Sequence, residues 1–123
     1  MARYLVDGMN VIGSRPDGWW KDREGAMARL VESLERHARG SDVEIAVVFE
    51  RAPREPLGTG AVEVLHAPVA GRDAADDEIV RLLEAEQAPG AVTVVTSDRE
   101  LAARVRATGA AVEPAHAFRS RIE

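Results

Sequence analysis

The 123-residue sequence predicts a three-layer α/β sandwich built on a central, mainly parallel sheet. Its apolar runs are short, and several are rich in valine or isoleucine, as expected of strands that are buried on both faces. Helical patterns separate most of these runs, so the strands are expected to pair in parallel through right-handed crossovers. No linker, repeat or low-complexity segment divides the chain, and we therefore expect residues 1–123 to form one domain.

Five apolar runs are the predicted strands: residues 4–6, 43–49, 61–65, 91–95 and 110–112. Four helices are predicted at residues 22–39, 73–86, 98–107 and 114–121. The first of these helices has an apolar stripe from Ala26 to Ala38, with Asp22 as its start and Gly40 as its stop. Segments 13–22 and 50–60 are rich in glycine, proline and charge, and are predicted to be loops.

The composition excludes several classes of site. The chain has no cysteine, which rules out disulfides and thiolate zinc sites, and its three histidines lack the spacing of metal ligands. No apolar stretch is long enough to span a membrane, and no signal-peptide pattern opens the sequence, so a cytoplasmic location is expected. The net charge is −5, yet every cation except Lys21 is arginine. The preference for arginine over lysine has two explanations, host codon usage and phosphate binding, and composition alone does not decide between them.

Acidic and amide side chains follow the predicted strands where each strand ends. Asp7 and Asn10 follow the first strand, Glu50 follows the second, and Ser97 and Asp98 follow the fourth. A further acidic group opens the helix after the third strand, with members Asp73, Asp76, Asp77 and Glu78. Because the carboxyl ends of parallel strands meet at one edge, where α/β proteins bind ligands, these acids are expected to converge.

Each acid also has a purely structural explanation. Asp7 could simply begin an Asp-Gly turn, and Asp98 lies inside a Ser97-x-x-Glu100 capping box. Residues 73–78 would stabilise a helix N-terminus through the macrodipole. At about 100° per residue, Asp76 falls at the edge of the apolar stripe, Asp73 fits an N-cap, and Asp77 is a possible outer partner.

Converging carboxylates call for a cation, because like charges at close range repel one another. Hard oxygen donors without histidine or cysteine suit Mg²⁺ or Mn²⁺, which commonly bridge to phosphate. Other chemistries fit less well, since the chain lacks an Asp-x-Asp after the first strand, a glycine-rich phosphate loop and a G-x-S-x-G elbow. The residues therefore predict metal-dependent phosphoryl transfer or nuclease chemistry.

Four motifs resemble those of a known family, in the same order along the chain. They are residues 7–13 (DGMNVIG), 47–50 (VVFE), 75–79 (ADDEI) and 95–101 (VTSDREL). They resemble the motifs of NYN domains, which are PIN-like ribonucleases, and most of all the bacterial YacP-like branch. The resemblance implies a PIN-like three-layer α/β/α sandwich and endoribonuclease activity with Mg²⁺ or Mn²⁺ on RNA.

Residue by residue, the resemblance implies that Asp7, Asp76 and Asp98 bind metal and that Asn10 belongs to the catalytic set. Glu50 departs from the family's usual aspartate at its position, so Glu50 and Asp77 are expected only as auxiliary metal-binding acids. Ser97 is expected to position water or phosphate.

The loop between residues 13 and 23 holds both tryptophans beside cations, a combination that often binds single-stranded RNA. Arg15, Trp19 and Trp20 are therefore expected to contact substrate. Arg72 and Arg99 are expected near the same sheet edge, where they could form a basic rim that also binds substrate. The tryptophans could equally cover the core, staple the following helix or form a dimer interface, and both a monomer and a homodimer stay open.

Two functions from different classes fit these patterns. The first is a metal-dependent endoribonuclease that hydrolyses single-stranded RNA. The second is a noncatalytic RNA- or ribosome-associated binding module with a vestigial acidic cluster. A deoxynuclease is a weaker third possibility.

Overall fold

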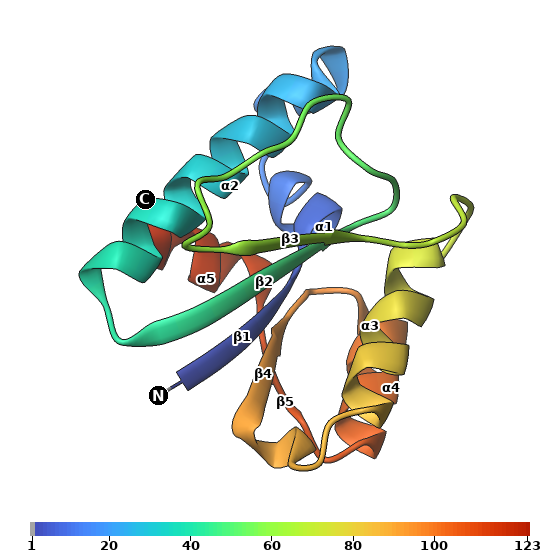
Figure 1. Cartoon of the computed structure of the whole chain (residues 1–123). Coiled ribbons are helices and arrows are strands. Elements are labelled where there is room, and N and C mark those ends of the chain that lie inside the picture. The colour runs from blue at the N-terminus through green and yellow to red at the C-terminus, as the bar shows by residue number, and fades with distance from the viewer. Residues whose placement is uncertain (1) are drawn as a thin grey trace.

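The computed structural model describes residues 2–123. One sheet contains five strands: β1 (Ala2–Asp7), β2 (Val43–Phe49), β3 (Glu63–His66), β4 (Val92–Val95) and β5 (Ala111–Glu113). Their order is β3-β2-β1-β4-β5, and every neighbouring pair is parallel (Figure 1). The predicted α/β class and the parallel sheet are confirmed. The central position of β1 brings the first acidic motif to the middle of the carboxyl edge.

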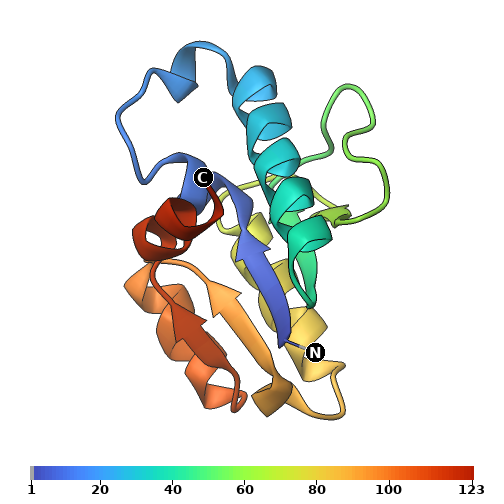
Figure 2. The same ribbon diagram turned by 90° about the vertical axis from the view of Figure 1, so that its left-hand side faces the viewer.

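Helices cover both faces of the sheet. The helices α1 (Gly8–Ile12), α2 (Arg23–Gly40) and α5 (Ala115–Ile122) lie on one face. The helices α3 (Ala74–Glu84) and α4 (Arg99–Ala107) lie on the other (Figures 1 and 2). Two short 3-10 helices, η1 (Trp19–Lys21) and η2 (Pro89–Ala91), lie in the connections. Within residues 2–123, no helix has both the length and the apolar character needed to cross a membrane.

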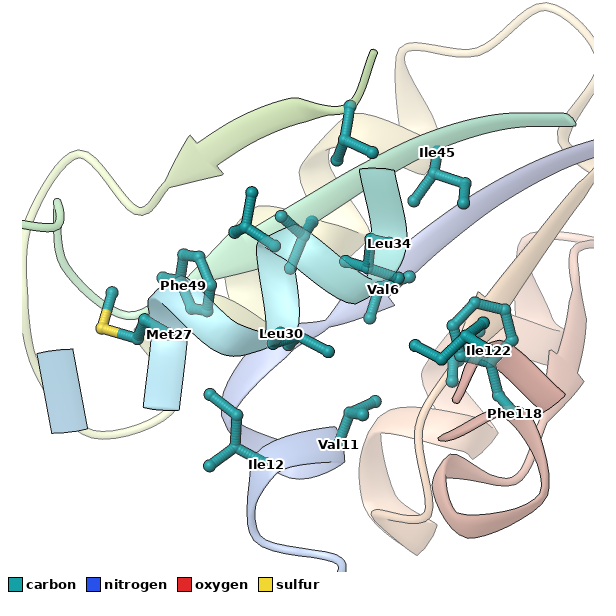
Figure 3. Close-up of a cluster of buried hydrophobic side chains, with 14 of the residues drawn as sticks. Val6, Val11, Ile12, Met27, Leu30, Leu34, Ile45, Phe49, Phe118 and Ile122 are labelled. Carbon is teal, nitrogen blue, oxygen red and sulfur yellow. The ribbon is translucent and has the colours of Figure 1, made fainter. Parts of the chain in front are cut away.

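Alternating residues of β1 face two separate cores. Val6 packs into the cluster formed with α1, α2 and α5, where Leu34 and Phe118 are fully buried (Figure 3). Leu5 packs into the cluster formed with α3 and α4. Because successive side chains of a strand point to opposite faces, Asp7 follows Leu5 onto the α3–α4 face. This parity decides which helices can supply partners to the Asp7 carboxylate.

The helix α1 is the main element that the sequence did not predict. A turn at the Asp-Gly pair was the alternative explanation of Asp7, and in the structure Gly8 instead begins a five-residue helix directly after β1. A Cβ atom at Gly8 would lie 2.5 Å from a ring carbon of Phe49, so close packing requires glycine here. The other elements begin and end within a few residues of their predicted positions, and Asp22 caps α2 by accepting a hydrogen bond from the Gly25 amide.

A buried carboxylate on α2 holds the long connection between β2 and β3. Glu35 is 2% exposed, and its two oxygens accept hydrogen bonds from Thr59 and from the Val62 amide, the latter at 2.9 Å. Burial alone would raise the pKa of Glu35, but these hydrogen bonds, together with the charge of Arg39, hold it below its ordinary value. The connection is therefore fixed to α2 through one side chain.

We expect Glu35→Ala to lower the free energy of unfolding by about 2–4 kcal/mol, because it leaves the buried Val62 amide and the partly buried Thr59 amide without their acceptor. Urea denaturation near neutral pH measures the change. Glu32→Ala is the matched control on the same helix, since the Glu32 side chain is 72% exposed and its ion pair with Arg36 lies on the surface. Equal losses for the two variants would contradict an anchoring role for Glu35.

Candidate functional site

Three aspartates lie around the carboxyl ends of β1 and β4. Asp7 ends β1 and is 5% exposed, Asp76 lies half-buried in the first turn of α3, and Asp98 is the N-cap of α4. Thr96 links two of them, because its hydroxyl donates to Asp7 Oδ2 at 2.9 Å and accepts from the Asp98 amide at 3.1 Å. The end of β4 therefore fixes the Asp7 side chain and the start of α4 together.

The start of α4 differs from the predicted capping box. Asp98, rather than Ser97, is the N-cap, and its Oδ1 accepts a hydrogen bond from the Leu101 amide at 2.9 Å. The Ser97 hydroxyl instead accepts from the Ala115 amide at 2.9 Å, and the Ser97 amide donates to Asn10 Oδ1 at 2.8 Å. Ser97 and Asn10 thus tie the β4–α4 connection to α5 and α1.

The carboxylates of the site lie within electrostatic range of one another. Burial is the largest influence on Asp7 and, with the charges of Asp76 and Asp98, it raises the pKa of Asp7 from 3.8 to about 7. The Thr96 hydrogen bond opposes this shift. Burial also raises the pKa of Asp76 to about 6, with the Asp98 charge as the next cause. The positive charge of Arg104 offsets only part of the shift at Asp76, so both groups resist ionising.

Some carboxylate oxygens of the three aspartates remain available to bind a ligand. The Thr96 hydroxyl donates to one oxygen of Asp7, and the backbone amide of Asn10 also acts on that carboxylate. The Leu101 amide donates to one oxygen of Asp98, and no hydrogen bond from residues 2–123 reaches the carboxylate of Asp76. In the described chain, no three acidic or histidine side chains already stand in a metal-binding group. Mg²⁺ usually takes only one or two carboxylates and keeps several waters, so this donor set fits a hydrated divalent ion.

The neighbouring acids of α3 lie outside the centre of the site. Asp73 is exposed and has a left-handed backbone, with φ at 62°, and its side chain makes no capping hydrogen bond. The Asp77 side chain is 69% exposed and pairs with Arg104 at 2.9 Å. Asp73 thus occupies the expected N-cap position without capping through its side chain, and Asp76 is the member of the group whose pKa the Asp98 charge raises.

Glu50 is not among the charges that act on Asp7 and Asp76. It follows β2 and lines a small hollow on the α2 side of the sheet, together with Met9, Arg23 and Met27. The expected role of Glu50 as an auxiliary metal ligand therefore stays a prediction.

The predicted substrate-binding arginines have different surroundings. Arg15 pairs with Glu123 at 2.6 Å, which ties the loop after α1 to the C-terminus. Arg72 lies exposed in the β3–α3 connection, and Arg99 lies exposed at the start of α4. Neither Arg72 nor Arg99 has an ion-pair partner within residues 2–123, so their charges are available beside the acidic site.

The two tryptophans have separate roles in the structure. Trp19 packs against the α2-side core, with the Arg23 guanidinium 5.2 Å from its ring centre. Trp20 meets Trp19 edge to face and is 52% exposed. Both lie in η1 near the start of α2, on the face opposite α3 and α4 (Figure 2). Trp19 thus covers part of the core and is half-buried, whereas Trp20 is exposed to solvent.

The different surroundings of the two tryptophans predict that one alanine variant loses stability and the other loses RNA affinity. Trp19→Ala is expected to lower the free energy of unfolding by about 1–3 kcal/mol, since it removes packing from the core. Trp20→Ala is expected to change stability by less than about 0.5 kcal/mol and to weaken single-stranded RNA binding on the order of tenfold through lost stacking. Urea denaturation and fluorescence anisotropy measure the two quantities. Unchanged RNA affinity in Trp20→Ala would remove this ring from the substrate-binding surface.

Thr96 is the site residue that sequence reasoning missed. The signal was a hydroxyl residue at the end of a valine-rich strand, directly before Ser97 and Asp98. Threonine is common in strands, so its type alone gave no reason to single it out. Only the parallel pairing of β1 with β4 brings its hydroxyl to Asp7.

Comparisons with known proteins agree with this geometry. Crystal structures of Rae1 (YacP) from Bacillus subtilis share the fold: one has a TM-score of 0.77 and 24% identity, covering 99% of this chain and 74% of that chain. The W164L mutant of that protein has a TM-score of 0.70 and 23% identity, covering 99% and 75%. No curated protein sequence matches the chain. The family model of the YacP-like NYN domain matches residues 4–123, so the chain belongs to this family of PIN-like nucleases.

Proposed function

We propose that this protein is a metal-dependent endoribonuclease that cleaves single-stranded RNA at the site formed by Asp7, Asp76 and Asp98. The observation that carries the proposal is the convergence of three carboxylates, where burial first and mutual repulsion second raise the pKa values of Asp7 and Asp76. Perturbed acids gathered at the carboxyl edge of a parallel sheet are typical of functional sites. Membership of a nuclease family supports the same reaction class.

The free oxygens of Asp7, Asp76 and Asp98 would hold Mg²⁺ or Mn²⁺. When bound, such an ion would offset the negative charge that develops on the phosphate and would make a nearby water more acidic. The fit rests on the donor set, because carboxylate oxygens are the ligands these ions prefer.

Residues around the three aspartates would orient the Asp7 carboxylate and bind the RNA substrate. The Thr96 hydroxyl fixes one oxygen of Asp7, so the other oxygen keeps a constant direction. The Asn10 side chain uses its carbonyl oxygen to hold the Ser97 amide, which leaves its NH₂ group as a donor for a phosphate oxygen or water. Arg72 and Arg99 would attract the RNA backbone to the edge of the acidic centre.

Cleavage of a labelled single-stranded RNA tests this proposal. The wild-type domain is expected to cut the RNA in Mn²⁺ and to stop in excess chelator. Asp76→Asn is expected to lower the rate on the order of 10²–10³-fold, the loss typical when a group that stabilises transition-state charge is disabled. Asp77→Asn is the matched control from the adjacent position and is expected to keep most of the activity, because Asp77 is exposed and paired with Arg104.

Two outcomes of this experiment would contradict the proposal. One is RNA that stays intact with the wild-type domain in Mn²⁺, which would favour the noncatalytic RNA-binding module. The other is equal activity in Asp76→Asn and the wild type, which would place the chemistry elsewhere. Cleavage of single-stranded DNA at the same rate would widen the substrate class beyond RNA.

A further inference from the structure

A hollow of about 310 Å³ adjoins the acidic site and lies between α4 and the segment that contains β5. Its lining includes Thr96, Ser97, Arg99, Arg106 and Pro114. Thr96 also donates a hydrogen bond to Asp7, so one residue is shared by the hollow and the acidic site of Asp7, Asp76 and Asp98. The hollow then follows α4 toward the C-terminal end of that helix, beside the edge strand β5, whose Val112 also contributes to the wall.

Two arginines line this hollow from the same flank of α4. Arg99 and Arg106 are seven residues apart, which is nearly two full turns of helix, or about 10 Å along the axis. Both are exposed, and neither has an ion-pair partner within residues 2–123. Most other arginines of the chain are paired, as Arg104 is with Asp77 on the opposite flank of the same helix.

The acids close to the hollow do not neutralise these two cations. Glu113 ends β5, but both of its carboxylate oxygens accept hydrogen bonds from Arg121 at 2.9 and 2.8 Å. Glu100 lies four residues before Arg104, and therefore on the Arg104 flank of the helix rather than on the flank of Arg106. The hollow is thus lined by two unneutralised arginines, and it extends from the acidic site along α4.

We infer that this hollow, the α4–β5 groove, binds the phosphate backbone of the RNA on one side of the cleaved bond, with Arg99 near the site and Arg106 farther along. The inference rests on the proposed function and adds the path of the strand and Arg106 as a residue that binds it. Guanidinium groups match phosphate oxygens, and two of them in line fit a strand better than a single anion. The hydrogen bonds of Ser97 to Asn10 and Ala115 keep the entrance of the groove rigid.

Binding without cleavage tests the groove separately from catalysis. Fluorescence anisotropy in excess chelator gives the affinity for a labelled single-stranded RNA of about ten nucleotides, for the wild type, Arg99→Gln, Arg106→Gln and the double variant. A plot of log affinity against log salt has a negative slope. Each phosphate contact that is lost should make this slope less steep by about 0.7. The double variant should therefore lose about 1.4 from the slope and bind on the order of tenfold more weakly.

Arg29→Gln is the matched control. Arg29 is an exposed arginine on α2 that has no ion-pair partner within residues 2–123, and it lines a different hollow with Ser33 and Arg36. It should leave both the affinity and the salt slope unchanged. Thermal melting of each variant checks the fold, because Arg106 in the last turn also interacts favourably with the helix dipole.

The outcomes separate this inference from the nuclease assignment. Loss of affinity and slope in the double variant supports the groove, whether or not the wild type cleaves RNA in Mn²⁺. A double variant that binds like the wild type overturns the groove, even if the wild type proves to be a nuclease. An equal loss in Arg29→Gln also overturns it, since general attraction by surface charge would then explain the binding.

Discussion

Replacing Asp7 with asparagine is expected to slow RNA cleavage on the order of 10²–10³-fold and, at the same time, to make the metal-free domain more stable at pH 8. The two effects share one cause, which is a carboxylate placed where it is costly to ionise. Asp7 is 5% exposed and lies near the charges of Asp76 and Asp98, so the pKa of Asp7 is raised from 3.8 to about 7. Asparagine keeps the shape of the side chain and removes the charge.

The direction of the pH effect follows from proton linkage. In the unfolded chain Asp7 ionises near its ordinary pKa, whereas in the native state it keeps its proton until the pH approaches about 7. Its contribution to stability is therefore fully present below the unfolded pKa and is lost as the pH rises through the folded pKa. One pKa unit corresponds to about 1.4 kcal/mol, so the loss can reach about 4 kcal/mol, an upper bound for a site into which water can enter.

Urea denaturation of both proteins in chelator at about pH 5 and about pH 8 measures this effect. Asp7→Asn should gain stability relative to the wild type as the pH rises, and its cleavage rate in Mn²⁺ should fall on the order of 10²–10³-fold. The side-chain carbonyl oxygen of the substituted asparagine can still accept the hydrogen bond from Thr96, so a general loss of structure is not expected. A stability difference that stays the same at both pH values would show that Asp7 ionises freely in the folded protein.

Local sequence patterns carried most of the information about the fold. The strands β2 and β4 are rich in valine and isoleucine, and α2 has a regular apolar stripe, so these elements could be predicted from the sequence pattern. The helix α1 could not, because Gly8-Met9-Asn10 opens with a glycine that is a poor helix former. Its glycine is explained by the Phe49 ring, which lies about 40 residues away in sequence and comes close only in the folded sheet.

The candidate site, like the fold, could be predicted from the sequence only in part. Strand ends and parallel topology were enough to bring Asp7, Asp76 and Asp98 to one edge, but they carried no information about individual contacts. Asp98 and Ser97 are both good N-cap residues, and only the position at which α4 begins decides between them. The face on which Glu50 lies and the pairing of Arg15 with Glu123 likewise depend on distant parts of the chain.

Binding of Mn²⁺ is expected to become tighter as the pH rises from about 5 to about 8, and to release protons at the lower end of that range. The metal requires ionised carboxylates, but the pKa of Asp7 is about 7 and that of Asp76 is about 6, so both hold protons in mildly acidic solution. Each displaced proton should weaken the apparent affinity about tenfold per pH unit below the pKa of its group. The bound ion also relieves the repulsion among the carboxylates, so millimolar Mn²⁺ should raise the melting temperature most at pH 8.

Isothermal titration calorimetry in buffers with different heats of ionisation counts the protons directly. At about pH 6, the wild type should release more protons per Mn²⁺ than Asp76→Asn, because the variant has one fewer carboxyl to ionise. Asp77→Asn should behave like the wild type, since its ion pair with Arg104 lies on the surface. An affinity that does not change with pH, or proton release that is equal in all three proteins, would mean that Mn²⁺ binds away from Asp7 and Asp76. Binding that tightens with pH and depends on Asp76 would instead connect the raised pKa values to the metal that the proposed reaction requires.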